Sequence, residues 1–182
     1  MVEEKELVAA LQTEAEKEKA FRELVAQYKE RLYWQIRNMV LDHDDADDVL
    51  QNTFIKIFRN INSFKGDSKL HTWMYRIAAN ESITFINKKA KRNNVSIENV
   101  KDNALRNLES DIYFEGDALQ LLFQKAIATL PEKQRLIFTM KYFEDHTFEE
   151  LSEILETTTG GLKSSYHIAV KKITEYIKTH ED

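Results

Sequence analysis

Residues 147–173, TFEELSEILETTTGGLKSSYHIAVKKI, hold two runs of helical periodicity with a turn between them. In the first run, Thr147 is placed to cap a short helix whose apolar side chains recur at intervals of three and four residues. Residues 156–159, ETTT, then predict a turn, and residues 160–162, GGL, open a second helix. Two short helices with a tight turn predict a helix-turn-helix, whose second helix enters a major groove of DNA. A plain helical hairpin with the same apolar stripe is the alternative.

The second helix of this unit carries chemistry suited to DNA on one side. Its apolar stripe is expected to face inward and consists of Leu162, Ala169, Val170 and Ile173. The opposite side carries Lys163, Ser164, His167, Lys171 and Lys172. Small residues permit close approach, a helix N-terminus favours phosphate, and hydroxyl and imidazole groups can bond base edges. Tyr166 could lie on either side.

The remainder of the chain also has the composition of a helical protein. Its 182 residues include only four glycines and one proline, so each of these marks a junction between long helices. Pro131 ends one apolar-periodic run and is suited to the first position of the next helix. An α/β or all-β protein would need more turns. We therefore predict an all-α fold.

Composition excludes several other classes of protein. The apolar fraction is 42% and the charged fraction 31%, as in a soluble globular protein rather than a disordered or collagen-like chain. The absence of cysteine excludes a disulfide framework, a thiolate zinc site and a cysteine nucleophile. No apolar stretch approaches the ~20 residues that a membrane-spanning helix needs, and the N-terminus does not resemble a signal peptide. We therefore expect a cytoplasmic protein without membrane insertion.

Three amphipathic helices are predicted in the first half of the chain. Apolar spacing places one at residues 20–41, a second after the acidic residues 42–45 and ending near Ile61, and a third at residues 69–92. A polar loop precedes the third helix, for which Asp67 or Ser68 is the expected N-cap. These helices can share one apolar core. Ahead of them, the charge-dense N-terminal segment could form a loosely docked leading helix.

A composition change divides the chain in two. Residues 93–117 are rich in Asn, Ser, Asp and Glu, and their periodicity is weak, as expected for a linker. Because so long a loop is unusual inside one compact domain, we predict two small helical domains, residues 1–92 and 118–182, joined by a flexible linker.

The charge is unevenly distributed along the chain. The net charge is −5, yet residues 61–92 hold seven basic and two acidic side chains, a local charge of +5. A basic island in an acidic chain suggests contact with a polyanion. A solvated helix end is the alternative.

Three stretches resemble one known family, the extracytoplasmic-function (ECF) sigma factors of bacterial RNA polymerase. Residues 44–54, DDADDVLQNTF, look like region 2.2 of that family. Residues 64–80, FKGDSKLHTWMYRIAAN, are similar to its regions 2.3 and 2.4. Residues 130–135, LPEKQR, and the helix-turn-helix after them resemble its region 4. The block at 64–80 is the most specific, because it matches over many consecutive positions.

The resemblance implies a non-enzymatic, dissociable initiation subunit without cofactor or metal. Its partners would be core RNA polymerase, promoter DNA and an anti-sigma factor. It would contact the polymerase at the β′ clamp helices and the β flap. Domain 2 would bind the polymerase through Asp48, Gln51, Asn52 and Ile55. It would read and open the minus-ten element with Phe64, Lys65, Ser68, Arg76, Asn80, Lys88, Lys89, Lys91 and Arg92. Domain 4 would read the minus-thirty-five element with Thr159, Lys163, Ser164, His167, Ile168 and Lys171.

In similar proteins the loop before the third helix captures a base flipped out of the non-template strand. Unstacking a base costs a few kcal/mol, so both a pocket and a cationic track are needed to hold the strand. Here Phe64, Lys65, Ser68 and Asn80 would form the pocket. A tryptophan at the position of Trp73 more often packs in the core than stacks on a base. For Tyr75 the sequence does not decide between these two roles.

The chain departs from the family pattern at two sites. Gln51-Asn52 stands where relatives often have Gln-Glu, and the recognition helix lacks the usual arginines, which alters base readout. The acidic pair Asp47-Asp48 could also be a solvated face. An autonomous helix-turn-helix regulator is the second hypothesis, although it has no need for the basic loop and helix after Phe64. A helical hydrolase or metalloenzyme is disfavoured because the five histidines are scattered.

Overall fold

The computed structural model describes residues 4–108 and 118–180. Every regular element in these ranges is helical, which confirms the all-α prediction. The elements in chain order are α1 (Glu4–Leu11), α2 (Lys17–Val40), α3 (His43–Asn60), the 3-10 turn η1 (Ile61–Ser63), α4 (Leu70–Arg92), α5 (Ile97–Leu108), α6 (Ala118–Thr129), α7 (Glu132–Tyr142), α8 (Phe148–Leu155) and α9 (Thr159–His180).

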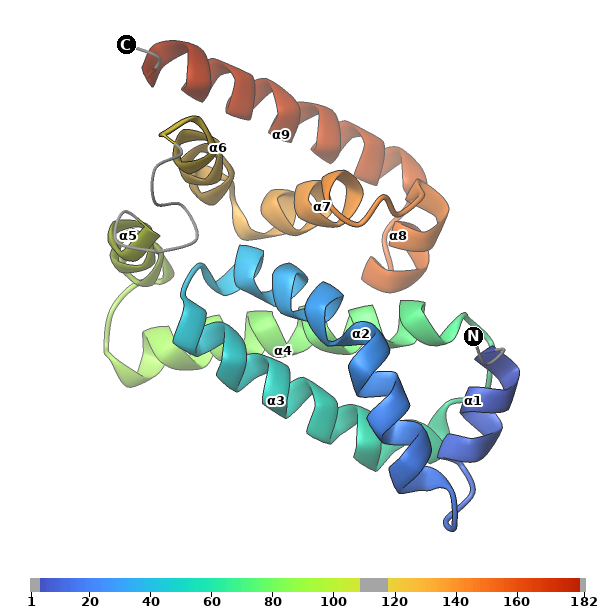
Figure 1. The fold of residues 1–182 in the computed structure, drawn as a ribbon. Coiled ribbons are helices and arrows are strands. Elements are labelled where there is room, and N and C mark those ends of the chain that lie inside the picture. Colours follow the sequence, from blue (N-terminus) through green and yellow to red (C-terminus); the bar gives the residue numbers. More distant parts are fainter. Residues whose placement is uncertain (1–3, 109–117, 181–182) are drawn as a thin grey trace.

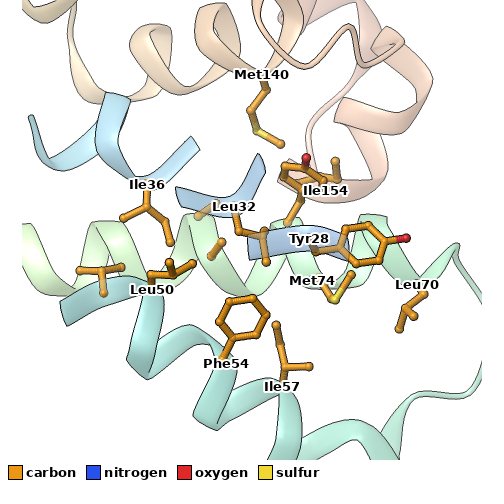
Figure 2. Close-up of a cluster of buried hydrophobic side chains, with 14 of the residues drawn as sticks. Tyr28, Leu32, Ile36, Leu50, Phe54, Ile57, Leu70, Met74, Met140 and Ile154 are labelled. Carbon is orange, nitrogen blue, oxygen red and sulfur yellow. The ribbon is translucent and has the colours of Figure 1, made fainter. Parts of the chain in front are cut away.

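Helices α2, α3 and α4 form the lower half of the molecule in Figure 1 and match the three helices predicted from apolar spacing. Their stripes meet in one core, in which Leu32, Ile36 and Ile57 are fully buried (Figure 2). The turn between α2 and α3 is tight because Leu41 takes a left-handed conformation (φ 66°) and Asp42 caps α3 by accepting a hydrogen bond from the Asp45 N–H at 3.1 Å.

Helices α6 to α9 form the upper half, with α9 running along the top of Figure 1. They have a small core of their own that includes Ile127, Phe138 and Ala169. The main core also extends into this half, since Met140 of α7 and Ile154 of α8 point down toward α2 (Figure 2). The two halves therefore pack directly against each other, a contact that local apolar patterns do not predict.

A buried arginine joins the two halves. The Arg135 guanidinium of α7 donates from Nη2 to the Met39 carbonyl of α2 at 3.0 Å and from Nη1 to the Ala128 carbonyl at 3.3 Å. Burial lowers the pKa of Arg135 to about 10, so the side chain is still charged at neutral pH. Its two hydrogen bonds to carbonyls offset part of the cost of burying that charge.

The segment predicted as a linker contains a helix. Residues 97–108 form α5, whose Val100, Ala104 and Leu108 are buried, the last two against Leu41 and Ala128. The spacing Ile97, Val100, Ala104, Leu108 is a helical signal that the polar composition of the segment obscures. Residues 109–117 of the predicted linker lie outside the described part of the chain.

Two local predictions were wrong. The N-cap of α4 is Lys69, not Asp67 or Ser68, and the Lys69 side chain makes no capping bond. Val170 is exposed rather than inward, because Leu162, Ala169 and Ile173 alone form the buried stripe of α9. The predicted cap of α8 is confirmed: Thr147 and Glu150 form a reciprocal capping box, with bonds of 3.1 and 3.0 Å.

Candidate nucleic-acid and polymerase interfaces

The loop before α4 exposes part of the predicted minus-ten site. Lys65, Gly66 and Asp67 are exposed and Ser68 is half-buried. Gly66 has φ +78°, a conformation that favours glycine, and open space surrounds it. Phe64 does not line this surface: its ring is buried and lies 5.4 Å from the Trp73 ring, centroid to centroid. The aromatic ring anchors the loop to the core because it is large and apolar.

Arg76 and Asn80 lie one turn apart on α4, at a groove of about 340 Å³ between α4, α7 and α8. Asn80 is exposed. The Arg76 guanidinium is engaged by α8: it donates to the Glu153 carbonyl and pairs with the Glu156 carboxylate, Nη1 to Oε1 3.2 Å. A cation at the C-terminal end of a helix is favoured by the helix dipole. In this arrangement Arg76 therefore holds the two halves together.

The C-terminal turns of α4 carry the basic side chains. Lys88, Lys91 and Arg92 are exposed, as expected for a cationic track. Lys89 is instead turned toward α3, where it forms an ion pair with Asp45. Since a helix rises ~1.5 Å per residue, the track begins about 12 Å from Asn80. The nine predicted minus-ten residues therefore lie along the whole length of α4 and its preceding loop.

The predicted polymerase-binding residues share one exposed face of α3. Asp48, Gln51, Asn52 and Ile55 recur at three- and four-residue intervals, and all four are exposed. Ile55 is 42% exposed, an unusual position for a large apolar side chain beside polar neighbours. The opposite face of α3 packs into the core through residues such as Val49 and Ile57. The acidic pair Asp47-Asp48 is exposed as well.

The helix-turn-helix is formed by α8 and α9. Glu156 ends α8 in a left-handed conformation (φ 52°), and α9 begins three residues later. Five of its predicted DNA-contacting residues are exposed on α9, and Thr159 is half-buried at the helix start. The exposed residues are Lys163, Ser164, His167, Ile168 and Lys171. The N-terminal half of α9 is thus open to an incoming surface.

The three aromatic residues left open by the sequence are packed in the structure. Tyr75 is 2% exposed and donates a hydrogen bond to Glu144 Oε2 at 2.8 Å. Trp73 is half-buried against the main core. Tyr166 packs inward, with its ring 5.8 Å from that of Phe138. None of the three presents a free ring for base stacking in this arrangement.

A cluster of ionisable residues between α4 and α8 has no counterpart in the sequence-based predictions. His146 is buried, and its ring lies 6.1 Å from that of His71. Both imidazoles reach Glu150, with N–O distances of 3.7 Å, and Lys69 Nζ lies 3.2 Å from the same carboxylate. The Thr147 N–H, then Lys69, lower the pKa of Glu150 to about 2. Scattered histidines gave no signal of this cluster, because it forms only where the halves meet.

The buried His146 predicts that acid weakens the fold. Burial first, and then the nearby His71, lower the pKa of His146 below its ordinary value of 6.5. As pH falls through 6.5 the unfolded chain binds this proton before the folded chain does, so the free energy of unfolding decreases. Urea unfolding should therefore give a lower free energy of unfolding at pH 5.5 than at pH 7.5. Protonation of Glu150 lowers the free energy of unfolding further only below about pH 4.5.

His146→Gln is the matched variant for that measurement, since it removes the titrating group and keeps a neutral polar side chain. Its free energy of unfolding should depend less on pH between 7.5 and 5.5 than that of the unchanged protein. Equal pH dependence in the two proteins would show that other groups cause the loss.

Comparison with known proteins identifies the family. Residues 24–92 match the family model of sigma-70 region 2, and residues 120–173 match that of sigma-70 region 4. The ECF RNA polymerase sigma factor SigW of Bacillus subtilis is 32% identical over 157 residues, which cover 81% of this chain and 83% of SigW. The chain belongs to the ECF sigma-factor family. Members of this family are non-catalytic transcription initiation factors.

Other relatives agree with this assignment. The RNA polymerase sigma-H factor of Pseudomonas aeruginosa is 30% identical over 154 residues, 80% of each chain. Two solved structures share the fold of this ECF sigma factor. CnrH in complex with the cytosolic domain of CnrY has a TM-score of 0.71 at 17% identity, covering 98% of this chain and 99% of that one. RpoE of Bartonella quintana, in complex with the anti-sigma factor NepR, has a TM-score of 0.70 at 20% identity, covering 90% and 99%.

Two further properties concern the described residues only. Within residues 4–108 and 118–180, no three His, Asp or Glu side chains gather as they would around a metal ion. Over the same ranges, no helix of this ECF sigma factor combines the length and apolar character needed to cross a bilayer.

Proposed function

We propose that this protein binds core RNA polymerase and directs it to a specific set of promoters, as a non-enzymatic, cytoplasmic subunit that needs no cofactor. The observation that carries the proposal is that both sigma regions are present, each with most of its predicted contact residues exposed. The exposed stripe on α3, formed by Asp48, Gln51, Asn52 and Ile55, is the surface proposed for the polymerase clamp. The β flap is proposed as a second contact, made by the region 4 half.

Promoter recognition is proposed to use two separate surfaces. Lys65 and Ser68 in the loop and Asn80 on α4 would hold a base flipped from the minus-ten element, while Lys88, Lys91 and Arg92 track the strand. The N-terminal half of α9 would read the minus-thirty-five element in the major groove. Because α9 carries lysine, serine and histidine in place of arginine, it would make fewer bidentate contacts to bases. A larger share of its contacts would then be to the phosphate backbone of the DNA.

The direct packing of the two halves bears on this function. Arg76 cannot contact DNA while its guanidinium is bound to Glu153 and Glu156 of α8. We propose that α4 and α8 separate when the holoenzyme binds a promoter. RpoE, which shares this fold, was solved in complex with the anti-sigma factor NepR. We propose that an anti-sigma factor of this protein would act by keeping its polymerase and DNA surfaces covered.

Run-off transcription tests the proposal directly. Core polymerase from the source organism would be incubated with a library of promoter fragments, with and without this protein. New start sites that appear only with the protein are the expected result. Duplex binding in the absence of polymerase, without any new start site, would instead indicate an autonomous helix-turn-helix regulator.

Two substitutions distinguish the DNA surfaces in that assay. Asn80→Ala should cost about 1–3 kcal/mol in promoter use and relax selectivity at one minus-ten position, because a base contact is lost. Lys163→Ala should weaken use of all promoters about equally and reduce the salt dependence of binding. Asn87→Ala and Lys178→Ala, exposed positions on the same two helices, are the matched controls. Equal selectivity in the Asn80 and Asn87 variants would contradict the assignment.

A further inference from the structure

The N-terminal helix α1 and Gln12, the residue after it, contact the two ends of the loop that precedes α4. At the loop's start, Gln12 Nε2 donates to the Ile61 carbonyl at 3.0 Å and to the Phe64 carbonyl at 2.9 Å. At the loop's end, Glu4 Oε1 accepts a hydrogen bond from the Leu70 N–H at 2.9 Å. One short helix and the residue after it thus hold a loop that lies about fifty to sixty-six positions further along the chain.

The Glu4 contact supplies what the α4 terminus lacks. The first N–H groups of a helix have no partner within the helix. Lys69 at the N-cap has no side-chain oxygen to accept from them, and it makes no capping bond. The Glu4 carboxylate provides an acceptor and also places a negative charge at the positive end of the helix dipole. This cap comes from a distant helix rather than from the loop.

The Gln12 contact is equally specific in its chemistry. A glutamine amide has two N–H donors on one nitrogen, and here the acceptors are the backbone carbonyls of Ile61, which begins η1, and of Phe64, which follows its end. Helix α1 is fixed in place by Leu7 and Leu11, which are buried in the main core. The amide is therefore presented from an anchored helix, and the backbone on each side of Phe64 is fixed with it. Between these clamps, residues 65–67 stay exposed.

We propose that Gln12 and Glu4 are positioning residues that hold the loop in the conformation that selects the captured base. The proposal rests on the proposed function, since the loop must be the one that captures a base. A loop ordered before binding loses less conformational freedom when the base enters, and it presents Lys65 and Ser68 in a fixed arrangement. Helix α1 lies before residue 24, where the match to sigma-70 region 2 begins.

Gln12→Glu is the most direct test, because it keeps the shape of the side chain. It replaces the amide NH2 group, which donates both hydrogen bonds, by a carboxylate oxygen that repels both carbonyls. The holoenzyme would be titrated with a single-stranded minus-ten oligonucleotide in four versions, one for each base at the captured position. For each protein we compare the affinity for the preferred oligonucleotide with the affinities for the other three. In the Gln12→Glu holoenzyme this ratio should be about tenfold lower than in the unchanged holoenzyme, because two ordinary hydrogen bonds are lost. Affinity for core polymerase and for minus-thirty-five duplex should stay within twofold of the unchanged protein.

Three comparisons make the result decisive. Gln27→Glu makes the same chemical change at an exposed position of α2 and should leave the ratio unchanged. Glu4→Ala, at an exposed position, removes the α4 cap without disturbing the core and should also lower the ratio. If Gln12→Glu and Glu4→Ala weaken all four oligonucleotides equally, the positioning role is overturned while the capture site stands. If the unchanged holoenzyme shows no base preference, both the positioning role and the proposed capture site are overturned.

Discussion

Replacing Leu32 by alanine is expected to lower the free energy of unfolding by about 2–5 kcal/mol, the usual cost of emptying a fully buried leucine site. Leu32 has no exposed surface and lies at the centre of the main core (Figure 2). Around it pack side chains of α2, α3 and α4 and, from the other half, Met140 and Ile154. Because that core is continuous between the halves, the whole protein should unfold in one transition at lower urea concentration.

Ile168→Ala is the matched control for this measurement. Ile168 is 48% exposed on α9, so its truncation should change the free energy of unfolding by no more than about 0.5 kcal/mol. Circular dichroism and tryptophan fluorescence should report the same midpoint for the Leu32 variant. Separate transitions for the two halves would show that their shared core contributes little to stability.

Ile55→Asp is expected to reduce the affinity for core polymerase by about 30-fold or more, which corresponds to the loss of about 2 kcal/mol seen for residues that dominate an interface. Ile55 is the one large apolar side chain on the exposed stripe of Asp48, Gln51 and Asn52. Burying a new carboxylate in the interface would require removing its water, which is unfavourable, and would add negative charge to a face that is already acidic. Because the side chain points away from the core, the fold should be kept. Fluorescence anisotropy of the labelled protein with core polymerase measures the loss.

The reciprocal variant is Ile168→Asp. It should keep the affinity for core polymerase and weaken binding to minus-thirty-five duplex, since Ile168 is exposed on the recognition helix. Loss of polymerase binding in both variants, or in neither, would contradict the assignment of polymerase binding to α3 and of minus-thirty-five recognition to α9.

Much of the fold was predictable from local patterns. The stripes that define α2, α3 and α4 recur at helical spacing, and the few glycines and one proline leave little room for strands. The cap at Thr147 was predictable too, because a capping box joins residues only three positions apart. Helix α5 was missed although its apolar residues are correctly spaced, since only five of its twelve residues are apolar and the other seven are polar or charged.

The candidate site was predictable in its exposed parts and less so in its packed parts. Asn80, Lys163 and the stripe on α3 lie on open helix faces, where local spacing decides which way a side chain points. Phe64 and Lys89 were expected at the DNA surface, yet one packs on Trp73 and the other pairs with Asp45. Their partners belong to other turns or other helices, so their own neighbours in sequence do not reveal them.

The sequence by itself determined that the chain is helical, where most helices begin and end, and which family it belongs to. Only the tertiary structure decided that Glu4 caps α4, that Arg76 binds the end of α8, and that Arg135 holds the end of α2. These contacts join residues 66 to 96 positions apart. Apolar periodicity fixes which face of a helix is buried, but the angle and register between packed helices depend on how all their side chains interlock.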